Sequence, residues 1–183
     1  MDREILTTKI KEYKTEYSAE ATFIPRFVDL LKEKNAFLRK NMKRHFTASA
    51  WIFNPYNKEV ILIHHKKLSK WLQPGGHADG CENLYEVAQK EALEETGIIS
   101  IQNTFPEIFD IDIHTIPEYK NIPEHDHYDI RFLIIPENGS EIRKNNESNE
   151  VRWIKLNEVE KFAANNISIK RMVEKTKSMS DNL

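Results

Sequence analysis

The sequence predicts an α/β protein in which helices and strands are interleaved along the chain. Apolar residues recur at helical spacing within residues 1–43, and a second stretch of helical character covers 84–96. Runs rich in β-branched and aromatic residues predict strands, and these runs are 45–54, 59–65, 105–117, 128–136 and 151–154. Helices over 156–162 and about 168–178 are expected to close the chain.

Residues 1–43 are predicted to form a helical N-terminal extension, and residues 44–183 the main domain. Thr22 is expected to cap a second helix in the extension, with Pro25 tolerated in its first turn. Phe37 and Leu38 continue the apolar pattern. Because amphipathic stripes usually face a core, we expect the extension to pack on the main domain. A dimer surface and a wall over the substrate are the alternatives.

Two strands and a turn follow the extension. The run 45–54 is β-rich, residues 55–58 form the turn, and 59–65 is nearly continuously apolar. Such a run is typical of an inner strand. A lysine-rich segment comes next and leads to Pro74-Gly75-Gly76, which is a turn signal.

A helix with clear ends is predicted after this glycine-rich loop. Asn83 is suited to cap it, and Glu86 three residues later can complete a capping box. Residues 84–96 contain no glycine or proline. Gly97 stands where the end of a helix favours a residue that tolerates positive φ.

Along one face, the predicted helix changes from apolar to acidic residues. At roughly 100° per residue, its apolar face continues for one more turn as acidic residues. The apolar members are Leu84, Val87 and Ala88, and the acidic members are Glu91, Glu94 and Glu95. Carboxylates this close repel one another unless a cation lies among them. Carboxylate oxygens favour a hard divalent cation, so the sequence predicts an Mg²⁺ or Mn²⁺ site.

A strand with one wet face is predicted after the helix. In the run 105–117, isoleucines alternate with polar residues that include Asp110, Asp112 and His114. A loop containing His125 and His127 then leads to the strand at 128–136. The histidines at 114, 125 and 127 allow two interpretations, a zinc site or a contact with substrate or phosphate. The second is favoured, because no cysteine lies nearby.

The stretch from Gly76 to Ile98 resembles the Nudix box. That motif is glycine, five residues, glutamate, seven residues, then Arg-Glu-aliphatic-x-Glu-Glu-x-Gly-aliphatic. Here it is Gly76, Glu82 and the run KEALEETGI at 90–98, with every spacing kept. Lys90 replaces the usual arginine, and Ala92 is a small aliphatic residue. Lysine keeps the charge but loses the planar fork of arginine.

The resemblance implies a Nudix fold, which is an α/β/α sandwich around a mixed β-sheet. It implies hydrolysis of a diphosphate bond in a nucleoside diphosphate linked to another moiety. Glu91, Glu94 and Glu95 would hold the metal, and the carbonyl of Gly76 would complete its shell. Glu82 would support the loop. Lys90 precedes Glu94 by four residues, which is the spacing for an orienting ion pair.

The proton acceptor is predicted to be Glu95 or Glu147. The stretch 147–162 resembles the strand and helix that commonly close a Nudix domain, and Glu147 stands six residues before Trp153. A glutamate in this loop serves several Nudix enzymes as base or metal ligand. Glu150 is the competing residue.

Substrate contacts are predicted near the box loop. A polyphosphate must approach this loop to reach the metal, so Lys67 is the first candidate among the lysines before the glycines. His77 directly follows Gly76 and is the preferred histidine, and His127 is a further candidate. The resemblance leaves ADP-ribose, a nucleotide sugar, a nucleoside triphosphate, a dinucleoside polyphosphate and a CDP-alcohol open.

Composition agrees with a cytoplasmic enzyme that acts on a small-molecule nucleotide. The chain has 183 residues, 39% of them hydrophobic, and a net charge of −2, which argues against a partner that is a nucleic-acid polymer or a membrane. Cys81 is the single cysteine, so no disulfide framework is expected. A homodimer is compatible with the sequence.

Two other functions are alternatives to hydrolysis. A catalytically inactive Nudix-fold module that senses a nucleotide would usually have lost box glutamates, which this chain keeps. An isomerase of the superfamily that acts on a prenyl diphosphate would use a cysteine elsewhere in the chain, and Cys81 lies inside the box.

Overall fold

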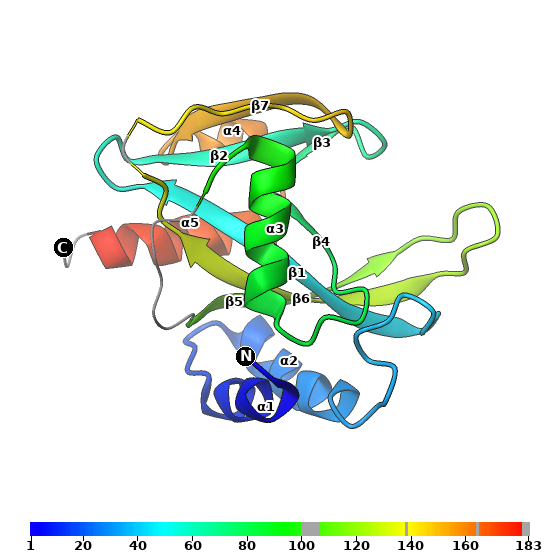
Figure 1. The fold of residues 1–183 in the computed structure, drawn as a ribbon. Helices are drawn as coiled ribbons and strands as arrows, with labels where there is room; N and C mark the ends of the chain where they lie inside the picture. The colour runs from blue at the N-terminus through cyan, green and yellow to red at the C-terminus, as the bar shows by residue number, and fades with distance from the viewer. Residues whose placement is uncertain (100–106, 138, 164, 181–183) are drawn as a thin grey trace. The chain divides into compact units, whose positions relative to one another are not determined.

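The computed structural model describes residues 1–99, 107–137, 139–163 and 165–180, and Figure 1 shows its helices and strands. Within these residues the helices are α1 (Arg3–Glu12), α2 (Ser18–Leu30), α3 (Leu84–Thr96), α4 (Val159–Phe162) and α5 (Ile167–Ser180). The strands are β1 (Arg44–Asn54), β2 (Glu59–His65), β3 (Lys70–Leu72), β4 (Gly75–His77), β5 (Ile108–Ile116), β6 (His125–Ile134) and β7 (Ser148–Lys155).

The chain forms two compact units. Among the described residues, the first unit contains Met1–Ser49, Gly75–Ala88 and 107–132. The second contains Ala50–Pro74, 89–99 and the described residues from 133 onward. The elements β1, β6 and α3 each contribute residues to both units.

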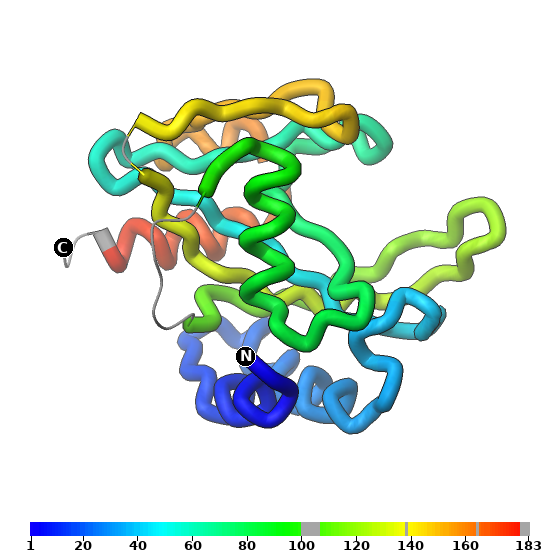
Figure 2. Tube along the Cα trace, in the orientation of Figure 1, coloured from blue at the N-terminus to red at the C-terminus, as the bar shows by residue number. Residues whose placement is uncertain are grey.

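The first unit holds β4, β5, most of β6 and the first half of β1. β4 pairs antiparallel with β1, with Gly76 opposite Ala48 and His77 opposite Thr47. β6 is the next neighbour of β1, and β5 follows β6. Figure 2 traces β5 into β6 through the hairpin at 117–124, and this antiparallel pair places His114 opposite His127.

Helices α1 and α2 pack on the apolar face of these strands. The ring of Phe27 on α2 lies 5.9 Å from that of Phe46 on β1 and 5.2 Å from that of Tyr128 on β6. All three side chains are almost completely buried. The N-terminal helices therefore supply part of the core of the first unit.

The second helix begins earlier than predicted. It starts at Ser18 after Tyr17, so Thr22 is not its cap and Pro25 lies in its interior. Residues 31–40 form turns and a bend instead of further helix. Burial of Phe27 and Leu30 stabilises the helix around a proline that cannot donate a backbone hydrogen bond.

The second unit is built around β2. This strand pairs with the second half of β1, with β3 and with β7, which confirms its prediction as an inner strand. The indole N–H of Trp51 donates to Thr176 of α5 at 2.8 Å. β7 and α5 were predicted, and both are longer than expected.

The glycines at 75 and 76 lie in a strand, so their prediction as a turn is wrong. A Cβ on Gly75 would lie 2.9 Å from the carbonyl oxygen of Ala48 and in contact with Ser49. Glycine is required here because β4 and β1 approach closely.

The face of β5 that was predicted to be wet is buried at Asp110, partly buried at Asp112 and exposed at His114. Asp110 is fully buried, and Arg131 of β6 donates to Asp110 at 3.1 Å, to Asp112 at 3.2 Å and to Asp129 at 2.8 Å. The hydroxyls of Thr47 and Ser49 donate to Asp129 as well. Ion pairing and hydrogen bonding allow these polar groups to be buried.

No helix in the described residues is both long and apolar enough to cross a bilayer.

Candidate active site

The acidic turn of α3 is the centre of the candidate site. The helix spans Leu84–Thr96, as predicted, and its apolar stripe is buried. The three glutamates that continue the stripe differ in exposure. Glu95 is only 4% exposed, whereas the side chain of Glu91 is 17% exposed and that of Glu94 is 52% exposed.

Lys90 lies beside two of these carboxylates. Its ammonium nitrogen is 3.4 Å from an oxygen of Glu94 and 3.8 Å from an oxygen of Glu91. The Lys90 side chain is 63% exposed, and an ion pair this exposed contributes little to the stability of the fold.

The carboxylates suit a hard divalent cation. Their donors are oxygen atoms, which Mg²⁺ and Mn²⁺ prefer. Glu95 is buried, and with Glu91 and Glu94 it continues the apolar stripe of the helix by one acidic turn. Glu91, Glu94 and Glu95 therefore fit the role of metal ligands on one helix face.

The start of α3 differs from the predicted capping box. The backbone N–H of Val87 donates to the carbonyl of Asn83 at 3.2 Å. The side-chain oxygen of Asn83 is buried and accepts no hydrogen bond from the described residues. The predicted side-chain cap is therefore wrong.

Glu82 is tied to the first helix. The guanidinium of Arg3 on α1 lies 2.7 Å from a carboxylate oxygen of Glu82, and it also donates to the carbonyl of Glu33 at 3.0 Å. The ring of Phe37 lies 5.0 Å from the same guanidinium. The loop before α3 is thus connected to the N-terminal segment within the first unit.

Gly97 ends α3 with φ +75°, which confirms the predicted left-handed residue. A Cβ added to Gly97 would lie 3.3 Å from the Cβ of Arg143. The backbone N–H of Arg143 also donates to the carbonyl of Thr96 at 2.7 Å. The segment after β6 is therefore fastened to the end of α3 in the second unit.

Glu94 lines a hollow of about 590 Å³ in the second unit. Its wall includes the acids Glu137 and Glu141 and the bases Arg143 and Lys144. These four residues could not be singled out before the structure was known, because none of them belongs to the box motif. Their common signal is the charged run that follows β6.

The remaining predicted residues lie at strand ends. Gly76 and His77 belong to β4. Lys67 and Glu147 are exposed just beyond β2 and β7, and the backbone N–H of Lys66 donates to the carbonyl of Glu147 at 3.1 Å. Burial lowers the pKa of nearby His65, and the Glu147 carboxylate opposes this shift.

Histidines gather at one end of the first unit. The loop predicted around His125 and His127 is strand β6, and this correction brings their side chains to one face of the sheet. Ligand atoms of His45, His77 and His127 all lie within 4.8 Å of one another. We call these three residues the histidine cluster. His45 was missed, because a lone histidine in a β-rich run gives no signal before the neighbouring strands are known.

The histidine cluster is held neutral. Burial lowers the pKa of His77 to about 4 and that of His127 to about 2. Neighbouring histidines lower both pKa values further, and Arg39 also lowers that of His77. Burial also lowers the pKa of His45. Neutral imidazoles are metal ligands and hydrogen-bonding groups, and they carry no charge for an ion pair with phosphate.

Comparison with known proteins defines the class of protein to which this fold and site belong. A family model described as the NUDIX domain matches residues 43–175. The chain therefore belongs to the Nudix family, which confirms the resemblance carried by the box and the α/β fold with a mixed sheet. It is a Nudix-type hydrolase.

One protein similar in sequence and two solved structures similar in fold agree with this family assignment. A Lactococcus lactis subsp. cremoris (strain MG1363) protein described as "Probable DHNTP pyrophosphohydrolase" is 30% identical over 135 residues, covering 72% of this chain and 78% of the relative. The MutT protein of Methanosarcina mazei Go1 superposes with a TM-score of 0.59 at 21% identity, covering 75% of this chain and 95% of that chain. A NUDIX family hydrolase from Clostridium perfringens superposes with a TM-score of 0.52 at 22% identity, covering 75% of this chain and 99% of that chain. These two structures show the fold alone.

Proposed function

We propose that the protein hydrolyses a diphosphate bond in a nucleotide derivative and that it requires a divalent cation, Mg²⁺ or Mn²⁺. The observation that carries this proposal is the acidic turn of α3. There Glu91, Glu94 and Glu95 replace an apolar stripe, and Lys90 lies 3.4 Å from Glu94. A solvated helix end would place its acids opposite the apolar face.

The glutamates of α3 would hold the cation. When bound, the cation would supply positive charge that neutralises the diphosphate oxygens and favours deprotonation of the attacking water. Lys90 would keep the Glu94 carboxylate in position.

The chain's own carboxylates would move the proton. Water attacks phosphorus, its oxygen forms the new P–O bond, and the bridging P–O bond of the anhydride breaks. Glu95 or Glu147 would accept the proton of the water. Glu95 is buried and Glu147 is exposed, so their glutamine variants distinguish the two roles. Loss of turnover in Glu147→Gln with affinity for Mn²⁺ retained identifies Glu147 as the base, whereas full turnover in Glu147→Gln leaves Glu95 in that role.

Positive groups would bind the phosphates. Lys67 is exposed before the glycines, and Arg143 and Lys144 share the hollow with Glu94. The triphosphate DHNTP is the first substrate to try, because a relative is described by that activity.

A substrate screen tests the proposal. The protein is incubated with DHNTP, nucleoside triphosphates, ADP-ribose, nucleotide sugars, dinucleoside polyphosphates and CDP-alcohols, each with Mg²⁺, Mn²⁺ or EDTA. We expect turnover of one class, lost in EDTA and restored by excess Mg²⁺. Turnover that survives EDTA contradicts the metal requirement. Nucleotide-protected melting without product would favour the sensing module.

A further inference from the structure

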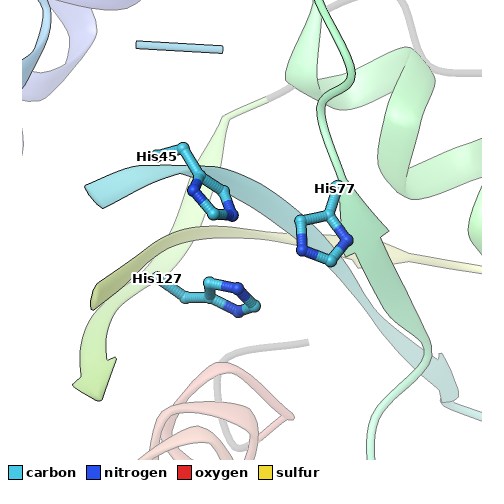
Figure 3. A group of neighbouring side chains, drawn as sticks. All are labelled: His45, His77 and His127. Atoms are coloured by element: carbon cyan, nitrogen blue, oxygen red, sulfur yellow. The ribbon is translucent and has the colours of Figure 1, made fainter. Parts of the chain in front are cut away.

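We propose that His45, His77 and His127 form a binding site for a transition-metal ion of the Zn²⁺ class. The three side chains come from β1, β4 and β6 and turn toward a common point, as Figure 3 shows. All three residues lie in the first unit. The site is independent of the proposed Mg²⁺ site in chemistry, because its donors are imidazoles instead of carboxylates.

His45 carries the strongest evidence. It is 2% exposed, and its Nδ1–H donates to the carbonyl of Asn41 at 3.0 Å. In the neutral ring this leaves Nε2 as the lone-pair nitrogen. That Nε2 is buried and has no hydrogen-bond partner among the described residues. Metal-binding histidines commonly donate their other ring N–H to a carbonyl in this way.

His125 extends the arrangement on β6. Its Nδ1–H donates to the carbonyl of Pro123 at 2.8 Å, and its Nε2 lies 3.3 Å from Nε2 of His127. The ring of His114, opposite His127 on β5, lies 5.4 Å from that of His127. The histidine cluster is therefore surrounded by further imidazoles whose rings are fixed by neighbouring strands.

The spacing is compatible with coordination. A tetrahedral Zn²⁺ with Zn–N distances of about 2.0–2.1 Å holds its nitrogens about 3.4 Å apart. The ligand atoms of the histidine cluster already lie within 4.8 Å of one another. Rotation of the side chains can therefore bring all three to coordination distance of one ion. Imidazole favours Zn²⁺, Cu²⁺, Ni²⁺ and Fe²⁺ over Mg²⁺. Three such ligands leave one position for water or a fourth group.

The alternative is a packed set of neutral rings without an ion. It accounts for the short distance between His125 and His127 as a hydrogen bond. It leaves the buried Nε2 of His45 without a partner, which is destabilising. A metal ion satisfies this atom and joins three strands next to Gly76.

Calorimetric titration of Zn²⁺ into the full chain tests the proposal, with excess Mg²⁺ present to occupy carboxylate sites. We expect one Zn²⁺ per chain, and an affinity at least ~100-fold lower in His77→Gln and in His127→Gln. The matched control is His64→Gln on β2 in the second unit, where the ring hydrogen-bonds Asn149. The affinity for Zn²⁺ should be unchanged in His64→Gln and in Glu94→Gln.

A second measurement covers variants that do not fold. Co²⁺ added to the wild-type protein should give the visible absorption of four- or five-coordinate cobalt with nitrogen ligands, and Zn²⁺ should displace it. Absence of this spectrum, or of Zn²⁺ binding, overturns the proposal. Binding that is equal in wild type and His77→Gln, or lost in Glu94→Gln, also overturns it. None of these readouts depends on hydrolysis, so failure of this proposal is distinguishable from failure of the proposed function.

Discussion

At the scale of single residues, the site departs from its family at Lys90. The usual arginine offers a planar fork, whereas the single ammonium of Lys90 lies 3.4 Å from Glu94 and 3.8 Å from Glu91. The ammonium can attract both carboxylates, but unlike a guanidinium it does not fix the orientation of either carboxylate plane. The consequence is an orienting contact that tolerates substitution by arginine better than loss of charge.

Substituting Lys90 tests this orienting role. We expect Lys90→Met to lower kcat by about 10-fold while the free energy of unfolding changes by less than about 1 kcal/mol, because the pair is exposed. Lys90→Arg should retain or raise kcat. Steady-state kinetics over a range of Mg²⁺ concentrations and thermal melts give both quantities. Equal kcat in Lys90→Met and wild type would show that the ion pair has no orienting role.

At the scale of elements, α3 was the most predictable part of the chain and the strands around it were less so. Its length follows from local signals, namely the absence of glycine and proline and the stop at Gly97. The strand assignment of Gly75 and the histidines of β6 depended on partners distant in sequence. Local patterns could not reveal that the aspartates of β5 are buried against Arg131.

Substituting Gly97 tests the role of this left-handed residue at the C-terminal end of α3. Alanine at φ +75° costs about 1–2 kcal/mol, and its Cβ would also approach Arg143 at 3.3 Å. Gly139 is the matched control, with φ +81° and nothing within 4 Å of an added Cβ. Chemical denaturation should show a larger loss for Gly97→Ala than for Gly139→Ala. Equal losses would indicate that the contact with Arg143 is irrelevant.

At the scale of the whole molecule, the N-terminal segment is integrated with the strands of the first unit. Phe27 is fully buried against Phe46 and Tyr128, and Arg3 reaches Glu82 in the box loop. The boundary between residues 43 and 44 stays a prediction. The sequence indicated an amphipathic segment but could not indicate its partner, because stripes of this kind also form dimer surfaces.

Truncating Phe27 tests how strongly the segment supports the fold. We expect Phe27→Ala to lower the free energy of unfolding by about 3–5 kcal/mol, as for other buried aromatic residues. The control is Ile5→Ala on α1, where the side chain is 47% exposed, with a change within about 0.5 kcal/mol. Denaturant titration followed by fluorescence measures both. A small loss for Phe27→Ala would mean that the helices are loosely attached.

The central claim is that carboxylates on α3 hold a cation needed for diphosphate hydrolysis, and Glu94→Gln tests it most directly. Its side chain is 52% exposed, so the variant should fold with an unchanged melting temperature. The claim predicts a loss of kcat/KM of at least ~100-fold at ordinary Mg²⁺, equivalent to about 2.7 kcal/mol of transition-state stabilisation. Glu86→Gln, exposed on the same helix, should keep full activity. Full turnover by folded Glu94→Gln would contradict the claim.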